Sequence, residues 1–586
     1  MPINSVTELV RSRADSHGDK RIYTFLKNGE TEAGQLNFAE VDRASRVVAS
    51  ALQETTTTGE RVLLMYAPGL DFITGFLGCL YAGVVAVPAY APNPVRPERY
   101  MPRLSAIAAS AGTRTILTTS DQASRLQPLM REFKAFESAR ILESDKFDPS
   151  EAGNWKPAPT HAGTLALLQY TSGSTSEPKG VMVSHGNILH NLAFIHDREA
   201  NDTNSISVTW LPSFHDMGLL EGILSPLYGA YPLYLMSPLA FIQRPFRWLN
   251  AISTYHATNS GGPNFSYEYC AQTISDEQRA GLDLSSWRVA YNGSEPVHME
   301  TMQKFSNVFS PCGFNIDAFC PVYGLAESTA LAAGKHHETS PFQQAPGHSG
   351  ASTIECGKAD GSSRILAVDP ETRIECADGI EGEIWLTGPS VAQGYWNDPE
   401  ETDRVFNAYL ADCGEGPFLR SGDLGYLIDG GVYITGRIKD LIILRGRKLF
   451  PQDIEYSAAR AHPLIRQQGV SAFSIHDGNT EHLVVLAELD QRRAKKAEMD
   501  AGDSSTQGTT EYKEIAHAIV ETVSREHEAR VTTALLLPPG QIARTSSGKI
   551  QRFLCRERFL AESIDVLFRW DTTERAKSIV KAASQH

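Results

Sequence analysis

The feature that most constrains the fold of this chain is an alternation, from residue 20 to about 330, of helix-like segments and short β-branched runs. The strand-like runs are RVLLMYA (61–67), VVAVPAY (84–90), RTILTT (114–119), TLALLQYTS (164–172), SISVTWLP (205–212) and YPLYLM (231–236). Such alternation predicts parallel strands covered by helices, which is the α/β class. The 586 residues leave room for roughly three to five folding units.

The chain changes character after residue 330. Residues 335–361, KHHETSPFQQAPGHSGASTIECGKADG, have no apolar periodicity and predict a long loop or an inserted element. Residues 362–438 carry strand-like runs separated by Asp-Gly and Gly-Gly pairs, which favours a small antiparallel barrel.

A smaller α+β region follows, and we place a domain boundary near Lys439. Its predicted elements are a helix over 451–461, strands over 470–475 and 482–489, a helix over 512–530 and a strand over 533–538. We therefore expect one domain of residues 1–438 and a second of residues 439–586.

Charge and cysteine content narrow the functional class. The 54 basic and 69 acidic residues leave a net charge of −15, and no Lys/Arg stripe is present that could follow a phosphate backbone, so we expect no nucleic-acid partner. The eight cysteines form no CxxC pair, which speaks against a disulfide framework or a zinc site. A reducing, cytoplasmic setting fits this pattern best.

The most apolar stretch, Phe72 to Val87, is 16 residues long and contains three glycines. A membrane-spanning helix needs about 20 apolar residues. We therefore expect no membrane span here, but a buried helix that ends at Gly83 and is followed by the strand VVAVP. The N-terminal residues reach charged side chains too early to form a secretory signal or an anchor.

A candidate phosphate loop, YTSGSTSEPKG, spans residues 170–180 between a predicted strand and a predicted helix. Small hydroxyl residues and Gly173 let backbone N–H groups converge on an anion, and Lys179 adds a positive charge. The segment is not a Walker A motif, because GxxxxGK[ST] is absent. An isolated Ser/Gly run would otherwise indicate a polar surface turn.

Four further segments combine apolar flanks with a few polar residues, which is typical of the lining of a cleft. They are WLPSFHDMGL around His215, YNGSEPV around Glu295, VYGLAES around Glu327 and FLRSGDLGYL around Asp423. Each polar residue alone is more simply interpreted as structural. His215 and Asp216 would form a hydrogen-bonded pair in a loop, Glu327 would be an acidic residue at a helix start, and Asp423 would stabilise a turn. Together they favour a functional site.

The order and spacing of these segments resemble the adenylate-forming superfamily of acyl-CoA synthetases, luciferases and peptide-synthetase adenylation domains, over nearly the whole chain. The resemblance implies a large N-terminal domain, with two αβαβα-type subdomains and a small β-barrel (362–438), and a smaller mobile C-terminal α+β domain. It implies ATP and Mg²⁺ as cofactors. The phosphate loop would then include Thr171, Ser172, Gly173, Ser174, Thr175 and Lys179.

The same resemblance implies the other nucleotide contacts. Adenine would stack beside Tyr323, in the segment Tyr323, Gly324, Leu325 and Ala326, with the backbone around Ser294, Glu295 and Pro296 nearby. Glu327 would hold Mg²⁺. Asp423 would accept both ribose hydroxyls, with Arg437 close to it.

The C-terminal motifs fit the resemblance as well. GRIKD, residues 436–440, is similar to the superfamily's hinge, with rotation about Lys439. IARTSSGKIQR, residues 542–552, resembles the C-terminal lysine motif and implies Lys549 as the catalytic cation. Within the superfamily, HDMGL, NGSEPV, Ala326 and the non-periodic element resemble fatty acyl-AMP ligases, in which an insertion at 335–361 would disfavour the use of CoA.

The implied reaction is attack of a fatty carboxylate on the α-phosphorus of ATP, which gives acyl-adenylate and pyrophosphate. Both partners are anionic, so catalysis would be electrostatic and positional, with Glu327, Lys179 and Lys549 in the main roles. The acyl chain would enter an apolar tunnel, with the candidate lining residues His215, Asp216, Met217, Gly262, Pro263 and Asn264. His215 would lie near the carboxylate end, and the acyl group would pass to an acyl carrier protein.

Two other hypotheses stay open. A long-chain acyl-CoA synthetase would carry out the same first half-reaction with a different acceptor. A non-catalytic adenylate-binding protein would be expected to lose Lys549, Glu327 or Asp423, and all three residues are present. A zinc hydrolase is disfavoured because none of the 17 histidines completes an HExxH motif. The sequence predicts neither the length of the acyl chain, nor the identity of the carrier protein, nor the oligomeric state.

Overall fold

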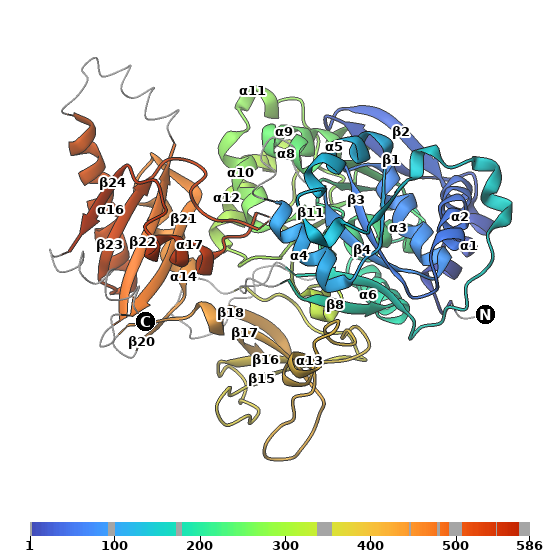
Figure 1. Cartoon of the computed structure of the whole chain (residues 1–586). Helices are drawn as coiled ribbons and strands as arrows, with labels where there is room; N and C mark the ends of the chain where they lie inside the picture. The colour runs from blue at the N-terminus through green and yellow to red at the C-terminus, as the bar shows by residue number, and fades with distance from the viewer. Residues whose placement is uncertain are drawn as a thin grey trace. The chain divides into compact units, whose positions relative to one another are not determined.

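The computed structural model describes residues 3–91, 100–171, 178–336, 354–444, 447–476, 481–490, 507–545 and 548–572 (Figure 1). The chain separates into two compact units. The N-terminal unit comprises residues 1–421 and 425–434, and the C-terminal unit comprises residues 422–424 and 435–586. The α/β class predicted from the alternation is confirmed. The predicted hinge at Lys439 stays a prediction.

The first large sheet of the N-terminal unit has six strands, in the order β6-β5-β3-β4-β7-β8. Pairs among β3 to β7 are parallel, and β8 pairs antiparallel with β7 at one edge. The strands are β3 (Arg61–Tyr66), β4 (Val85–Tyr90), β5 (Thr115–Thr118), β6 (Arg140–Glu143), β7 (Leu165–Tyr170) and β8 (Gly180–Ser184). The helices of this region are α2 (Phe38–Thr55), α3 (Leu70–Ala82), α4 (Met101–Ala111), α5 (Ser120–Met130) and α6 (His185–Arg198).

The most apolar stretch of the sequence forms α3 and β4, as predicted. Ten residues of α3 are buried, and the helix ends at Gly83, whose φ of 73° is in the left-handed region that favours glycine. The backbone N–H of Gly83 bonds the last carbonyls of the helix. Across the described residues, no helix is both long enough and apolar enough to span a membrane.

The second large sheet has eight strands, in the order β14-β13-β12-β11-β9-β10-β1-β2. Strands β13, β12, β11, β9, β10 and β1 run parallel, and β14 and β2 are antiparallel at the two edges. The strands are β1 (Arg21–Lys27), β2 (Thr31–Asn37), β9 (Ser207–Thr209), β10 (Leu233–Met236), β11 (Asn259–Gly262), β12 (Val289–Asn292), β13 (Phe319–Gly324) and β14 (Leu331–Gly334).

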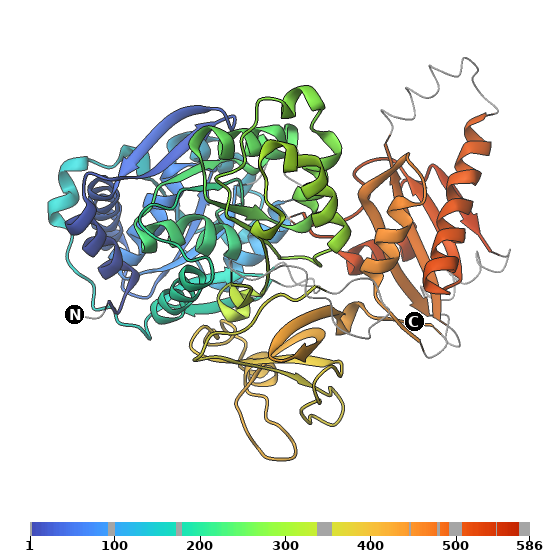
Figure 2. The ribbon, with the colours of Figure 1, turned by 180° about the vertical axis from the view of Figure 1, so that it is seen from behind.

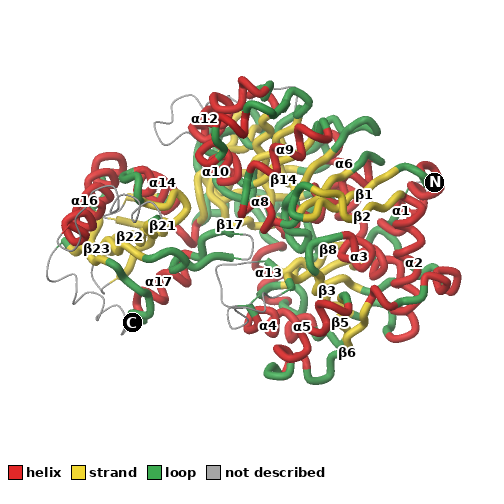
Figure 3. The backbone as a smooth tube through the Cα atoms, turned by 90° about the horizontal axis from the view of Figure 1, so that it is seen from above, coloured by secondary structure: helices red, strands yellow, loops and turns green. Residues whose placement is uncertain are grey.

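Helices surround the strands of the N-terminal unit, which occupy its interior (Figure 3). Around the second sheet they are α1 (Val6–His17), α7 (Ser225–Gly229), α8 (Pro238–Gln243), α9 (Phe246–Tyr255), α10 (Asn264–Thr273), α11 (Asp276–Arg279) and α12 (Met299–Phe309). Seen from behind, the green helices between residues 238 and 309 gather at one side of the unit (Figure 2). An aromatic cluster that includes Trp248, Tyr267, Trp287 and Phe305 fills the core there.

A four-stranded sheet, β15-β16-β17-β18, follows in the region where the sequence predicts a small antiparallel barrel. Its strands are β15 (Arg364–Val368), β16 (Gly382–Thr387), β17 (Leu419–Ile428) and β18 (Gly431–Arg437), and α13 (Pro399–Phe406) lies between β16 and β17. β15 pairs antiparallel with β16, and a two-residue turn joins β17 to β18, as antiparallel strands allow. Of the predicted insertion, residues 337–353 lie outside the described residues.

The C-terminal unit is built on the sheet β21-β22-β23-β24, beside the small hairpin β19-β20. Its elements are β19 (Ile442–Leu444), β20 (Arg447–Leu449), α14 (Pro451–Arg460), β21 (Ile465–His476), β22 (Glu481–Leu489), α16 (Gln507–His527), β23 (Val531–Leu537), α17 (Arg552–Leu560) and β24 (Phe568–Asp571). Helices α14 and α16 pack on one face of this sheet, and α17 packs on the other. Five elements predicted from the sequence here are confirmed, with α16 starting five residues early.

Candidate active site

The candidate site residues of the N-terminal unit follow the carboxyl ends of parallel strands. The segment around His215 follows β9, Pro263 follows β11, and Ser294 follows β12. Glu327 follows β13, and these four strands are neighbours in one sheet. Because the carboxyl ends of parallel strands meet at one edge, the sheet brings together segments that are more than 100 residues apart in the sequence.

The phosphate-loop candidate joins β7 to β8. Ser172, Gly173, Ser174 and Thr175 lie outside the described residues, so the structure describes only the two ends of the loop. The backbone N–H of Thr171 donates to the carbonyl of Lys179 over 3.2 Å, which closes the loop at its base. Arg103 of α4 donates to the carbonyl of Thr171 over 2.5 Å and holds the same end.

Lys179 lies in a cluster of charged and aromatic side chains. Its ammonium pairs with Glu401 and lies 5.2 Å from the ring centroid of Tyr395, over the ring face. Glu401 also accepts two hydrogen bonds of 2.6 Å from Arg404. The hydrogen bonds from Arg404 lower the pKa of Glu401 to about 2. Partial burial opposes this shift, and the bond and charge of Lys179 add to it. Glu401 is therefore ionised at neutral pH.

Glu327 belongs to the 3-10 turn Ala326–Ser328 that follows β13. Its Oε1 accepts a hydrogen bond of 2.8 Å from the hydroxyl of Tyr395. Burial, and then the charge of Glu327, raise the pKa of Tyr395, so the phenol stays protonated and acts as the donor. Tyr395 thus contacts both Lys179 and Glu327.

Helix α6 holds the two loops of this cluster in place. The amide of Asn187 donates to the carbonyls of Pro389 and Val391 over 2.8 and 2.9 Å. The amide of Asn191 donates to the carbonyl of Leu331 over 2.7 Å and accepts from the N–H of the same residue. Both asparagines are buried, so their amides satisfy backbone groups that would otherwise lack partners.

Tyr395 and Glu401 were not among the residues singled out from the sequence. The run Asp398-Pro399-Glu400-Glu401 does carry a helix-start signal, and Asp398 caps α13 by accepting from the N–H of Glu401. That signal predicts a helix but not its neighbour, because Lys179 and Glu401 are 222 residues apart in the chain. Only the tertiary structure brings them together.

The predicted acyl-binding segment around His215 contacts the predicted nucleotide-binding segment around Ser294. Nδ1 of His215 is 2.5 Å from Oδ1 of Asp216, which also accepts the N–H of Met217 over 2.7 Å. The sulfur of Met217 accepts a hydrogen bond from the hydroxyl of Ser294 over 3.4 Å. Ser294 has a positive φ of 66°, so the backbone turns sharply here.

The Gly262 and Glu295 segments are joined in the same way. Glu295 accepts the N–H of Phe265 over 2.5 Å, and Asn264 accepts the N–H of His298 over 3.1 Å. A Cβ on Gly262 would lie 2.7 Å from the ring of Trp210, so this position has no room for a side chain. Pro263 precedes α10 as its N-cap, and Pro296 follows Glu295 directly. These contacts join the segments around His215, Gly262 and Ser294 into one connected group.

Two buried carboxyl groups, those of Glu221 and Glu199, interact electrostatically with each other. Glu221 belongs to a turn of π-helix, Gly218–Leu224, that starts three residues after His215. Among the described residues, none forms a hydrogen bond with its buried Oε2. Burial, together with the charges of Glu199 and Asp216, raises the pKa of Glu221. Burial raises the pKa of Glu199 to about 7, against hydrogen bonds from Asn201 and Asn259. Burial therefore favours the protonated form of Glu221 in the folded protein.

The C-terminal unit contains the remaining candidates. Nε of Arg437 donates to Oδ1 of Asp423 over 2.7 Å, and Asp423 is nearly buried whereas Arg437 is 58% exposed. Lys439 lies in the 3-10 turn Ile438–Asp440 directly after β18. The predicted proximity of Asp423 and Arg437 agrees with this ion pair.

Lys549 lies in a hairpin whose described ends, residues 544–545 and 548–550, pair antiparallel at Arg544 and Ile550; residues 546 and 547 lie outside the described residues. Its N–H donates to the hydroxyl of Thr545 over 3.0 Å, and its carbonyl accepts from the N–H of Thr545 over 2.8 Å. Gly548 has a φ of 91°, which favours glycine. Arg544 donates to the carbonyl of Gly548 over 2.8 Å. Backbone and side-chain hydrogen bonds thus join the described ends of the hairpin.

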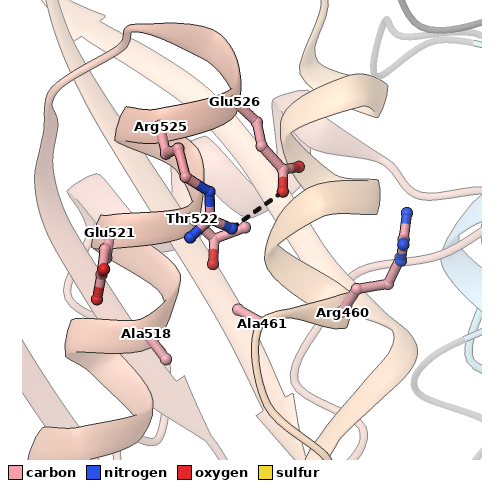
Figure 4. Close-up of a pocket in the computed structure, with 7 residues that line it drawn as sticks. All are labelled: Arg460, Ala461, Ala518, Glu521, Thr522, Arg525 and Glu526. Atoms are coloured by element: carbon pink, nitrogen blue, oxygen red, sulfur yellow. Dashed lines mark hydrogen bonds and ion pairs between the residues drawn. The ribbon is translucent and has the colours of Figure 1, made fainter.

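A cavity of about 410 Å³ lies between α14 and α16 (Figure 4). It is lined by Arg460, Ala461, Ala518, Glu521, Thr522, Arg525 and Glu526. Arg525 pairs with Glu526 over 3.2 Å. No residue predicted from the sequence for the site lines it, so we do not assign the reaction to this cavity.

Known proteins resemble this chain over nearly its whole length. The family model described as AMP-binding enzyme matches residues 10–396. A medium-chain-fatty-acid–[acyl-carrier-protein] ligase, JamA, of Moorena producens is 41% identical over 99% of this chain and 98% of its own. A long-chain-fatty-acid–AMP ligase, FadD26, of Mycobacterium marinum is 34% identical over 97% of this chain and 99% of its own.

A solved structure supports the same relationship. The crystal structure of a fatty acyl-adenylate ligase from L. pneumophila, in complex with acyl adenylate and pyrophosphate, is 36% identical to this chain. The TM-score is 0.71, and the match covers 97% of this chain and 98% of that chain.

Proposed function

We propose, on the premise that this chain belongs to the AMP-binding enzyme family, that it activates a fatty acid with ATP and delivers it to an acyl carrier protein. A carboxylate oxygen attacks the α-phosphorus, the bond to the β-phosphate oxygen breaks, and pyrophosphate leaves. The phosphopantetheine thiol of the carrier then attacks the acyl carbonyl, and AMP leaves. The observation that carries this proposal is the set of polar residues beyond the carboxyl ends of four neighbouring parallel strands.

The charged residues match the demands of the first step. Two anions must approach each other, so the site needs cations and aligned dipoles more than it needs a nucleophile. We assign Lys179 and the adjacent loop to the phosphates, Asp423 with Arg437 to the ribose, and Lys549 to the role of catalytic cation. Tyr323, with Gly324, Leu325 and Ala326, is assigned to the adenine, next to Ser294, Glu295 and Pro296.

Glu327 fits the requirements of a Mg²⁺ ligand. Mg²⁺ is commonly held by one or two carboxylates together with phosphate oxygens. Glu327 is only half-buried, and its Oε1 is oriented by Tyr395. Among the described residues, no group of three His, Cys, Asp or Glu side chains could hold a metal ion by itself. When bound, Mg²⁺ would offset phosphate charge.

We assign the binding of the fatty-acyl substrate to His215, Met217, Gly262 and Asn264, with Asp216 and Pro263 as supporting residues. Asp216 keeps the ring of His215 oriented, since Nδ1 faces its carboxylate at 2.5 Å. We assign His215 to the carboxylate end of the substrate. The eight cysteines are free thiols, which supports a reducing, cytoplasmic setting as part of the proposal.

Product analysis tests the proposal. The purified protein is incubated with ATP, Mg²⁺ and a fatty-acid mixture, alone, with CoA, or with a phosphopantetheinylated carrier protein, and products are identified by mass spectrometry. We expect acyl-adenylate in all three reactions, acyl-carrier in the third, and no acyl-CoA. Lys549→Ala should abolish product, whereas the matched variant Lys513→Ala, at an exposed position of α16, should not. Acyl-CoA formation would instead identify a long-chain acyl-CoA synthetase, and absence of adenylate would support a non-catalytic protein.

A further inference from the structure

Arg552 binds two carboxylates at once inside the C-terminal unit. Its Nε and Nη2 donate to the two oxygens of Glu455 over 2.8 and 2.7 Å, which is the bidentate fork geometry. Its Nη1 donates to Oδ2 of Asp440 over 2.6 Å. The side chain of Glu455 is 8% exposed, so this charge depends on its partner.

The three residues come from three separate elements. Arg552 is the first residue of α17 and lies three positions after Lys549. Asp440 ends the 3-10 turn that contains Lys439, and Glu455 lies on α14. Glu455 also accepts the N–H of Ala472 in β21 over 2.9 Å, which fixes its own position. Arg552 thus joins the end of the Lys549 hairpin to the chain segment at 438–440.

That segment is held at its other end as well. Arg437 pairs with Asp423 over 2.7 Å, and only two residues separate Arg437 from Asp440. Arg437 is thus paired before the predicted hinge at Lys439, and Asp440 is held by Arg552 after it. Each of these contacts lies within the C-terminal unit.

We propose that Arg552 is a positioning residue for the adenylation reaction: through Asp440 and Glu455 it fixes the Lys549 hairpin relative to α14 and to the chain that follows the predicted hinge at Lys439. This inference rests on the proposed function, because it concerns Lys549, which is assigned the role of catalytic cation. Electrostatic catalysis requires donors that are held in place before the charge develops. A lysine cannot replace the planar fork, since it offers a point charge on a flexible stem.

The test uses two conservative variants. Asp440→Asn removes one charge and leaves the fork on Glu455 intact, so it should fold; Arg552→Lys keeps the charge and loses the fork. Arg569→Gln is the matched control, because Arg569 also forms a two-donor pair, with Asp571, on β24. Pyrophosphate release gives kcat and the KM values for ATP and fatty acid. Hydrogen exchange reports on the amides of Gly548, Lys549 and Gln551.

We expect Asp440→Asn and Arg552→Lys to lower kcat about tenfold or more with both KM values within about twofold, since small displacements of catalytic groups cost rate rather than binding. Exchange at the three hairpin amides should accelerate, and Arg569→Gln should change neither quantity. Wild-type kcat or wild-type exchange in folded Asp440→Asn would overturn the positioning role. If the wild-type enzyme forms no acyl-adenylate, the proposed function fails, and the exchange result alone decides whether Arg552 holds the hairpin.

Discussion

The hydroxyl of Tyr395 donates a hydrogen bond of 2.8 Å to Oε1 of Glu327, across 68 positions of the sequence. The same ring lies 5.2 Å from the ammonium of Lys179, measured to the ring centroid. Tyr395 therefore links the residue assigned to the metal with the cation assigned to the phosphates. Four predictions follow from contacts of this kind.

Tyr395→Phe should weaken the binding of Mg²⁺ that we assign to Glu327. The substitution removes the donor to Glu327 and keeps the ring over Lys179. A hydrogen bond to a charged group contributes about 1.5–3 kcal/mol, so the Mg²⁺ concentration for half-maximal pyrophosphate release should rise about tenfold. Tyr409→Phe, at a 48% exposed position, is the control. An unchanged Mg²⁺ titration would show that this hydrogen bond does not orient the carboxylate.

Glu401→Gln should lower the KM for ATP. Glu401 is ionised, with a pKa of about 2, and competes with phosphate oxygens for Lys179. Ion pairs of this exposure contribute about 0.2–1 kcal/mol, so we expect a decrease of about threefold. Because the pKa of Glu401 is lowered, its charge is present above pH 4.5, and the effect should be equal at pH 6 and pH 8. Glu400→Gln, at the neighbouring exposed position, is the control, and a higher KM would mean that Glu401 orients Lys179 productively.

Gly218→Ala should disturb the His215 segment. A Cβ at residue 218 would lie 2.1 Å from the carbonyl oxygen of Pro212, so the backbone between them must move. Overpacking of this kind costs about 1–3 kcal/mol, which chemical denaturation can measure. The KM for fatty acid should rise more than the KM for ATP. Gly281→Ala, where a Cβ meets nothing within 4 Å, should leave both unchanged. Equal stability of the two variants would contradict the prediction.

Glu221→Gln should stabilise the protein at alkaline pH. The folded-state pKa of Glu221 is raised by burial and by Glu199 and Asp216, so folding favours the protonated form. Below about pH 4.5, the pKa of this carboxyl in the unfolded chain, Glu221 does not lower the free energy of unfolding. As the pH rises from there towards the folded-state pKa, the free energy of unfolding falls. Thermal unfolding should therefore show a higher Tm for the variant at pH 8 than for wild type, and a small difference at pH 5. Glu54→Gln, at an exposed position, controls for net charge, and a pH-independent difference would disprove the assignment.

Much of the fold could be predicted because its signals are local. The helix that ends at Gly83 was recognisable from a glycine between an apolar run and a β-branched run, and the structure confirms both elements. Helix α16 starts at Gln507 rather than Tyr512 and ends at His527 rather than Arg530, as expected for boundaries set by competing local preferences. Membership in the adenylate-forming superfamily is confirmed by the family match over residues 10–396.

The candidate site could be predicted only in part. Asp423 and Arg437 are 14 residues apart on neighbouring strands of one hairpin, so a single motif-rich region contains both. The roles assigned to Lys549, Glu327 and His215 stay predictions, and most of the phosphate loop lies outside the described residues. Tyr395 and Glu401 carry no signature that marks them, and the motif of residues 542–552, which ends at Arg552, does not predict the partners of that arginine. Each of the three acts through a residue distant in the chain.

The sequence by itself determined the α/β class, the order of the elements, the motif-bearing segments and the family. These follow from hydrophobic periodicity, glycine positions and short polar motifs, which depend on residues close together in the chain. The tertiary structure alone decided that Tyr395 joins Lys179 to Glu327, that Glu221 is buried with no partner for Oε2 in the described part of the chain, and that Arg552 ties Asp440 to Glu455. The physical reason is that burial and electrostatic coupling depend on distance in space, and packing of the sheets and helices sets those distances.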